Sequence, residues 1–174
     1  METIENLDIK CLSINKRGLN KSIKRRSIFL WIHNQNTQLT VQEIHSTKLT
    51  VDTWSAEWGG KAFFSHGTSN HANSKGVMIL INPKLDCKIE KCISDKTGRY
   101  IILDVSVEDS RLILVNIYAP NDLNQQSNFF RSLHLQLQDF SQENIVIGSG
   151  FNCALSDKDE KGTWKRGRPE SVCS

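Results

Sequence analysis

Four polar residues stand where predicted core strands of this sequence end. Asn15 follows the first strand and Glu43 the second, whereas Tyr118 ends a later strand and Asn152 follows the last. Polar residues just past the carboxyl ends of core strands often converge on a functional crevice. Magnesium prefers oxygen ligands and is commonly held by one or two carboxylates with waters and phosphate oxygens. Glu43 and Asn15 have suitable oxygens, and Tyr118 and Asn152 suit hydrogen bonds to phosphate. A turn role for each residue stays open at this point.

The last predicted strand runs into a glycine-rich segment, Gly148-Ser149-Gly150, ahead of Phe151 and Asn152. A serine between glycines is reminiscent of a serine hydrolase. The nucleophile elbow of those enzymes, however, needs glycine two residues on either side of the serine, and Ile147 and Phe151 occupy those positions. We therefore exclude that chemistry.

Basic residues cluster near the start of the chain. Six of them fall within eleven residues that contain no acid: Lys16, Arg17, Lys21, Lys24, Arg25 and Arg26. Such a cluster is suited to contacting the phosphates of a nucleic acid. A solvated helix face is the alternative. The candidate nucleic-acid-binding residues are Arg17, Lys21, Lys24, Arg25 and Arg26.

Composition bounds the class of protein. The chain has 174 residues and a net charge of +3, which is typical of one globular domain. No apolar run has the length of a membrane span, and no secretory signal is visible, so we expect an intracellular protein, nuclear or cytoplasmic, with no membrane partner. The five scattered cysteines favour reduced thiols over a disulfide framework or a zinc site. No obligate protein partner is evident.

Hydrophobic periodicity predicts strands alternating with helices. The helix over about 21–34 is predicted to be capped by Asn20 and to bury Ile23, Ile28, Trp31 and Ile32. A second helix carries Leu49, Val51, Trp54 and Trp58 and ends at Gly59-Gly60. A third helix is predicted to be capped by Ser127. The predicted strands span 8–14, 39–42, 61–65, 76–82, 87–93, 99–107, 111–118 and 144–148. This order predicts an α/β or α+β sandwich with helices outside the sheets.

Several segments together give the sequence a specific resemblance. The chain resembles the endonuclease domain of LINE-type (non-LTR) retrotransposons, which are similar to apurinic/apyrimidinic endonucleases within the endonuclease/exonuclease/phosphatase superfamily. The resemblance covers roughly residues 8–162 and rests on segments in family order: 13–19, 42–46, 57–60, 63–70, 75–77, 98–104, 116–121 and 148–152. We expect residues 163–174, which have no periodicity, to form a disordered tail outside the family.

The resemblance implies a four-layer, DNase I-like sandwich with two central mixed β-sheets flanked by helices. It implies Mg²⁺-dependent nicking of DNA, which leaves a 3′-hydroxyl for target-primed reverse transcription. By the same resemblance, Glu43 is the metal ligand, and Asn15 supports the metal and phosphate site. Tyr118 contacts the phosphate, and Asn152 orients the transition state.

The sequence departs from the family pattern in two ways. Gly150 stands where the family has the Asp that positions or deprotonates the attacking water. The final Asp and His of the family have no counterpart, so we expect a C-terminally truncated domain with an incomplete second sheet. Together these departures predict impaired catalysis. The alternatives are a residual nucleic-acid-binding module without catalysis and a non-functional retrotransposon remnant.

Overall fold

The computed structural model describes residues 9–15, 19–35, 37, 39–44, 48–67 and 75–151. For Asn15, residues 39–43, Lys48 and Ser149 it describes the backbone alone. The predicted site residues Arg17 and Asn152 and the predicted tail lie outside the described residues. The predicted domain boundary at residue 162 lies outside them too and stays a prediction.

The chain divides into two compact units. The first comprises Met1–Tyr118 and Phe140–Gly150, and the second comprises Ala119–Asp139 and Phe151–Ser174. The first unit contains all eight of the described strands and two of the helices. The second contains the helix α3 (Leu123–Leu137).

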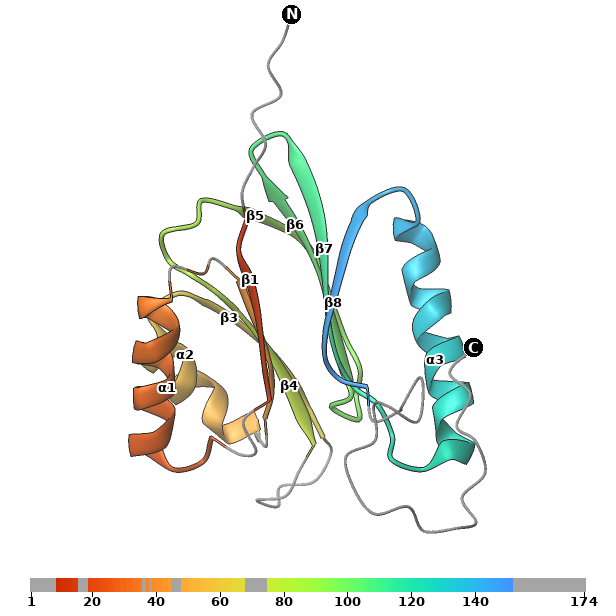
Figure 1. The fold of residues 1–174 in the computed structure, drawn as a ribbon, viewed down its shortest axis with the longest axis horizontal. Coiled ribbons are helices and arrows are strands. Elements are labelled where there is room, and N and C mark those ends of the chain that lie inside the picture. Colours follow the sequence, from red (N-terminus) through yellow and green to blue (C-terminus); the bar gives the residue numbers. More distant parts are fainter. Residues whose placement is uncertain are drawn as a thin grey trace, which may run out of the picture. The chain divides into compact units, whose positions relative to one another are not determined.

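The first unit is built on two four-stranded sheets (Figure 1). One sheet has the order β1-β2-β4-β3 and the other β5-β6-β7-β8. The β1–β2 and β7–β8 pairs are parallel, and the other pairs are antiparallel. The strands are β1 (Cys11–Asn15), β2 (Leu39–Glu43), β3 (Lys61–His66), β4 (Gly76–Ile81), β5 (Lys88–Ser94), β6 (Tyr100–Val107), β7 (Ser110–Tyr118) and β8 (Asn144–Gly150). The helices of this unit are α1 (Ser22–Asn34) and α2 (Val51–Trp58), with short 3₁₀ helices η1 (Lys48–Thr50) and η2 (Gln138–Phe140), the last shared across the unit boundary.

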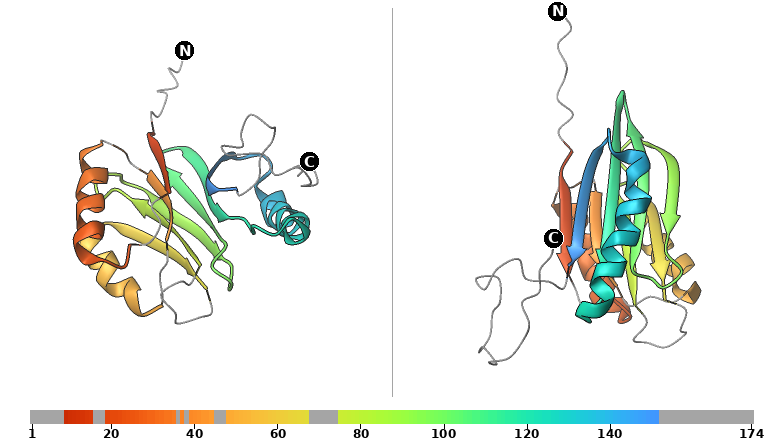
Figure 2. Two further views of the ribbon diagram at one scale, coloured as in Figure 1. Left: turned by 60° about the horizontal axis from the view of Figure 1, so that its bottom comes forward. Right: turned by 90° about the vertical axis from the view of Figure 1, so that its right-hand side faces the viewer.

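Strand β4 organises the core because both of its faces are buried. Side chains alternate across a strand, so Val77, Ile79 and Ile81 enter the core between the two sheets. Met78 and Leu80 enter a second core beneath α1 and α2. The first unit therefore has three layers, helices on sheet on sheet, as Figure 2 shows from two directions. The predicted α/β sandwich of two sheets with helices is confirmed.

Helix α1 begins and buries its residues differently from the prediction. It begins at Ser22, with Lys21 at the N-cap and no side-chain cap hydrogen bond, so Asn20 is not the cap. The buried residues are Arg25, Phe29 and Ile32, spaced at i, i+4 and i+7. Ile23 is 82% exposed and Trp31 46% exposed. The inward face was missed because one of its three positions is an arginine.

Helix α2 follows the prediction more closely. Trp54 and Trp58 are buried, and Gly59 ends the helix in the left-handed conformation at φ 75°. The indole nitrogen of Trp58 donates a hydrogen bond of 2.9 Å to the carbonyl of Ile81, which ties α2 to the end of β4. Leu49, predicted to belong to this helix, lies in η1 instead and is 84% exposed.

Helix α3 begins one turn earlier than predicted. Asp122 is its N-cap and accepts a 2.9 Å hydrogen bond from the backbone nitrogen of Asn124. Ser127 lies inside the helix. An aspartate with extended backbone is a strong N-cap, and it precedes the predicted serine in the chain.

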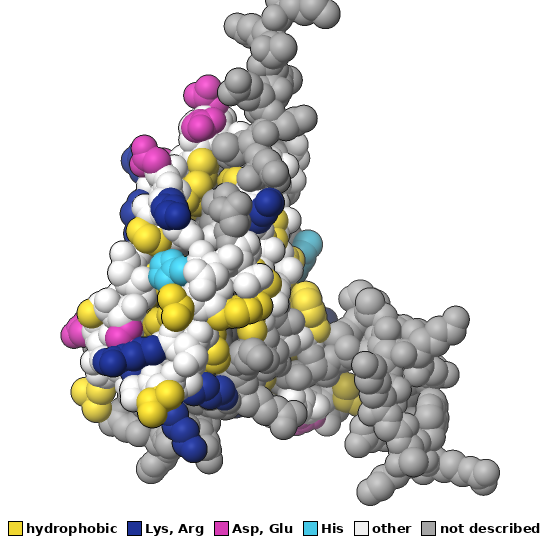
Figure 3. Space-filling model, turned by 60° about the vertical axis from the view of Figure 1, so that its left-hand side comes forward, with side chains coloured by type: hydrophobic (Ala, Val, Ile, Leu, Met, Phe, Trp, Pro, Cys, Tyr) yellow, Lys and Arg dark blue, Asp and Glu magenta, His cyan; other side chains and the backbone are white. Residues whose placement is uncertain are grey.

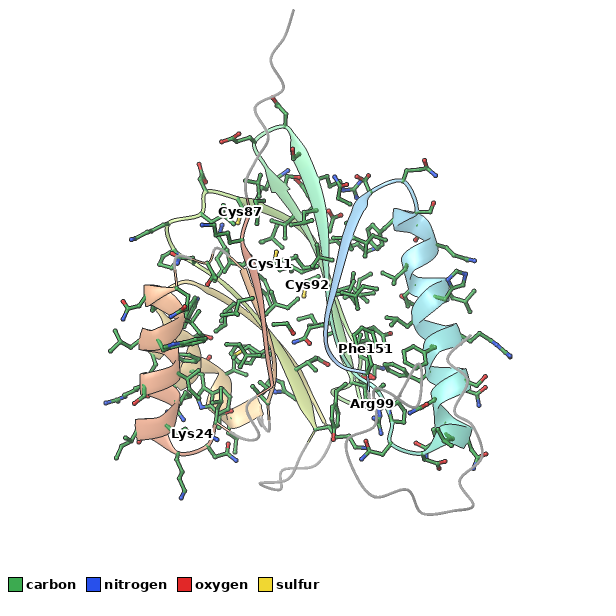
Figure 4. The ribbon with its side chains drawn as sticks, viewed as in Figure 1. Cys11, Lys24, Cys87, Cys92, Arg99 and Phe151 are labelled. Carbon is green, nitrogen blue, oxygen red and sulfur yellow. The ribbon has the colours of Figure 1, made fainter. Side chains whose placement is uncertain are left out.

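Three of the five cysteines lie among the described residues. Cys11, Cys87 and Cys92, labelled in Figure 4, are all free. No helix among the described residues is long and apolar enough to cross a membrane.

Candidate functional site

Two pairs of predicted site residues are register partners at strand ends. Asn15 pairs with Glu43 at the last position of the parallel β1–β2 pair. Tyr118 pairs with Gly150 at the last position of the parallel β7–β8 pair. Parallel pairing puts the carboxyl ends of both strands at one edge of their sheet. Each sheet therefore contributes one adjacent pair of candidate residues.

Both pairs lie at the same end of the sandwich. The carboxyl ends of β1 and β8 lie at the lower edge in Figure 1 and again in the right panel of Figure 2. Antiparallel β4 begins at this end, since Glu43 pairs with Val77. Antiparallel β6 also begins here, since Tyr100 pairs with Ile117. We call this end, defined by Asn15, Glu43, Tyr118 and Gly150, the strand-end edge.

The strand-end edge differs in one detail from the sequence prediction. The last strand continues to Gly150, so Ser149 and Gly150 belong to β8 and are not part of a corner after it. Gly150 is not among the described glycines with positive φ. Its backbone is therefore compatible with a side chain, and glycine is not required there for conformational reasons.

Arg99 contacts Tyr118 through both backbone and side chain. The Tyr118 nitrogen donates a 2.6 Å hydrogen bond to the Arg99 carbonyl. In return, Nη1 of Arg99 donates to the Tyr118 carbonyl at 3.1 Å. The guanidinium carbon lies 5.9 Å from the centre of the Tyr118 ring. Arg99 is thus fixed at the strand-end edge, at the lower end of the molecule in Figure 4.

The turn before Arg99 is fitted closely against the other sheet. A Cβ atom on Gly98 would lie 2.7 Å from the Lys75 carbonyl oxygen and 2.6 Å from the His66 carbonyl carbon, and it would also overlap the Gly67 nitrogen. Gly98 has φ 75°, in the left-handed region that favours glycine. The Ser65 hydroxyl donates a 2.9 Å hydrogen bond to the Asp95 carbonyl in the same turn. This packing brings the starts of β4 and β6 together.

Positive charge is concentrated at this junction. Lys75 immediately precedes β4 and its side chain is exposed. Burial, and then the nearby Arg99 guanidinium, lower the pKa of Lys75 from its ordinary value, while Asp95 acts in the opposite direction. The side chain of Asp95 also accepts hydrogen bonds from the backbone nitrogen and the hydroxyl of Thr97.

Of the basic residues predicted to bind nucleic acid, Arg25 has a structural role. Its side chain is 5% exposed and forms an ion pair with Glu57, with Nε 2.5 Å from Oε2. Nη1 donates to the Leu19 carbonyl at 2.9 Å, and the guanidinium carbon lies 5.0 Å from the centre of the Trp54 ring. The Arg25 hydrogen bond, opposed by burial, lowers the pKa of Glu57. The Arg25 side chain is therefore buried and paired within the protein, so its prediction as a phosphate contact is wrong.

The other described basic residues of this segment, Lys21, Lys24 and Arg26, are exposed. Arg26 contacts Glu57 at 3.2 Å while its side chain stays 71% exposed. Figure 3 shows Lys and Arg side chains among hydrophobic ones on this side of the molecule. The exposed hydrophobic residues of α1 are Ile23, Leu30 and Trp31.

A transposon protein is similar to this chain in sequence. The chain is 32% identical over 133 residues to the transposon TX1 uncharacterized 149 kDa protein of Xenopus laevis. The chain is a homologue of this transposon protein. The aligned part covers 76% of the chain and 10% of the TX1 protein, so the chain spans about a tenth of that relative. No protein-family model matches the chain.

Solved structures with the same fold include the endonuclease domain of a retrotransposon. Humanized TDP2 from D. rerio matches the chain with a TM-score of 0.61 at 12% identity, covering 84% of the chain and 63% of the TDP2 chain. The endonuclease domain of TRAS1, a telomere-specific non-LTR retrotransposon, matches with a TM-score of 0.57 at 10% identity, covering 82% and 60%. D. rerio TDP2 complexed with a single-strand DNA product gives the same values. The chain therefore shares the DNase I-like fold of these structures.

The strand-end edge follows from the sequence pattern, but the two cations beside it do not. Arg99 and Lys75 each precede a strand, whereas the predicted site residues all stand at or after strand ends. The segment from Gly98 to Tyr100 was noticed as part of the resemblance, without a role. The sequence feature that could have indicated Arg99 is a glycine directly before a basic residue at the start of a strand.

Proposed function

We propose that this chain is an endonuclease-type domain of retrotransposon origin that binds DNA phosphodiesters at the strand-end edge and hydrolyses them poorly. The observation that carries the proposal is the pairing of Asn15 with Glu43 and of Tyr118 with Gly150 at one end of the two sheets. Homology to the TX1 protein supports the retrotransposon origin. The shared fold of the TRAS1 endonuclease domain and of TDP2 bound to a DNA product supports DNA as the ligand.

The residue types at the edge fit a magnesium ion. Glu43 and Asn15 are adjacent in register and have the oxygen donors that this ion prefers. Among the described residues no group of three His, Cys, Asp or Glu forms a cluster. Mg²⁺ is often bound through one or two carboxylates, with waters and phosphate completing its shell. When bound, the ion would neutralise charge on the phosphate.

Tyr118 has a side chain that can bind phosphate, whereas Gly150 has no side chain that can act on the attacking water. Tyr118 is half-buried, and Arg99 holds both of its backbone polar groups, so its backbone is fixed at the edge. Its hydroxyl is suited to donate a hydrogen bond to a phosphate oxygen. Gly150, directly beside it, has no group that can orient a water molecule or accept its proton. Removing a general base commonly lowers a rate by a factor of about 10² to 10⁴. Binding is therefore retained and hydrolysis is impaired.

A combined binding and nicking assay tests this proposal. We expect the purified chain to bind a DNA oligonucleotide at low salt and to nick supercoiled plasmid in Mg²⁺ no faster than its Glu43→Gln variant. Failure to bind DNA would overturn the proposal. Rapid nicking by the unmodified chain, abolished by Glu43→Gln, would overturn the claim of impaired catalysis.

A further inference from the structure

Arg99 differs from the other arginines of the first unit whose side chains are described. Arg25 and Arg26 are paired with Glu57, and Arg111 is paired with Asp104 and Glu143. Within the described part of the chain, no carboxylate lies within ion-pair distance of the Arg99 guanidinium. Arg99 donates one side-chain hydrogen bond, to the Tyr118 carbonyl. Its other donors make no hydrogen bond to a described residue, so most of a planar, permanently charged group is available for an external anion.

A second cation lies next to Arg99. Gly98 packs against the carbonyl of Lys75, so the residues that start β4 and β6 are neighbours across the two sheets. The positive charge of Arg99 lowers the pKa of Lys75, after the larger effect of burial, which is the behaviour of two like charges in proximity. Asp95 offsets part of this charge, but its carboxylate already accepts from Thr97. The junction retains a surplus of positive charge.

The junction is built before any ligand arrives. Gly98 fits where no Cβ fits, the Gly67 nitrogen donates to the Lys75 carbonyl at 2.9 Å, and Ser65 holds the Asp95 carbonyl. The turn that precedes Arg99 is therefore held in place by contacts with residues 65–67 and with Lys75, which are distant in the sequence. Groups that are held in place before binding lose less conformational entropy when a ligand binds.

We propose that Arg99 and Lys75 form a phosphate-binding subsite beside the strand-end edge. This subsite binds a backbone phosphate of the DNA that neighbours the phosphate bound at Tyr118. The choice of DNA as the ligand rests on the proposed function. An arginine fork binds two phosphate oxygens at once, whereas a lysine acts as a point charge. The contact of Arg99 with Tyr118 links this subsite to the site of the scissile phosphodiester. Arg99 therefore determines the path of the strand across the edge.

The test compares Arg99→Gln and Lys75→Gln with the matched control Lys84→Gln. Lys84 is exposed and follows the opposite end of β4, so its variant loses the same charge away from the junction. Binding of a fluorescein-labelled single-stranded oligodeoxynucleotide is measured in EDTA over a series of KCl concentrations. We expect each junction variant to bind roughly 10-fold more weakly at low salt. We also expect the slope of log Kd against log salt to fall by about 0.7 to 1, the value of one lost phosphate contact.

The salt slope separates a phosphate contact from a structural role, because a merely structural loss leaves the number of displaced counterions unchanged. Arg99→Lys retains the charge, so its slope should match that of the unmodified chain even if its affinity falls. Equal slopes in Arg99→Gln, Lys75→Gln and Lys84→Gln would overturn the subsite while leaving the proposed function intact. No DNA binding by the unmodified chain would overturn both. If Arg99→Gln does not fold, Lys75→Gln, an exposed substitution, decides the outcome.

Discussion

Tyr118 and Gly150 are register partners at the last position of the parallel strands β7 and β8. The residue proposed to contact phosphate therefore stands directly beside the position where the resemblance implies a catalytic aspartate. The pairing places both residues at the carboxyl ends of adjacent strands. What differs is the side chain at position 150, and the backbone there accepts a side chain.

The Tyr118 hydroxyl is expected to contribute to DNA binding. Tyr118→Phe keeps the ring that lies beside Arg99 and removes only the hydroxyl. A hydrogen bond to a charged group contributes about 1.5 kcal/mol or more, so we predict a loss of about 10-fold in DNA affinity. Fluorescence anisotropy measures the affinity, and thermal unfolding serves as the control for folding. An affinity equal to that of the unmodified chain would remove Tyr118 from the site.

The Arg25–Glu57 pair is expected to stabilise the fold. Arg25→Leu leaves Glu57 without its buried partner, and breaking such a pair costs about 3 kcal/mol or more. Arg26→Leu is the matched control, because Arg26 contacts the same carboxylate from a 71% exposed side chain. Surface pairs contribute about 0 to 1 kcal/mol. Urea denaturation of both variants gives the comparison, and equal destabilisation would contradict the assigned interior role of Arg25.

The same pair predicts how stability depends on pH. The Arg25 hydrogen bond lowers the pKa of Glu57 in the folded state, so the folded protein binds this proton less readily than the unfolded chain does. The stabilisation is therefore complete above the ordinary glutamate pKa of about 4.3. It is lost as the pH falls through the lower pKa of the folded state. The difference in unfolding free energy between the unmodified chain and Glu57→Gln should narrow below about pH 4; a difference independent of pH would refute the pairing.

Two glycines with the same φ provide a test of the turn before Arg99. Gly59 and Gly98 both have φ 75°, but a Cβ on Gly59 meets no atom within 4 Å, whereas one on Gly98 overlaps the backbone of three residues. Gly59→Ala should cost about 1 kcal/mol for the left-handed conformation alone. Gly98→Ala should cost about 3 kcal/mol or more and weaken DNA binding, because Arg99 moves with the turn. Similar unfolding free energies for the two variants would contradict the close packing.

The sequence predicted what local patterns determine. Alternation and apolar runs located the strands, and parallel pairing then brought the predicted strand-end residues into register. The misses arise from interactions between distant segments. Arg25 looked like a surface cation because its partners, Glu57 and Trp54, lie about thirty residues further on. The position of Arg99 beside Lys75 could not be predicted for a similar reason, because it depends on the contact of Gly98 with Gly67 and Lys75. The Ser127 cap was wrong because Asp122, five residues earlier, accepts the cap hydrogen bond from the Asn124 nitrogen.

The central claim is that Gly150 impairs an otherwise assembled DNA-binding edge. Its most direct test is the rate of Mg²⁺-dependent nicking of supercoiled plasmid by the unmodified chain, by Gly150→Asp, and by Gly150→Asp combined with Glu43→Gln. We predict that the unmodified chain nicks at the background rate and that Gly150→Asp nicks measurably faster. The gain should be smaller than the factor of about 10² that a general base contributes to a complete site, because the family's final Asp and His have no counterpart here. The added Glu43→Gln should return the rate to background. Rapid nicking by the unmodified chain, or no gain in Gly150→Asp, would contradict the claim.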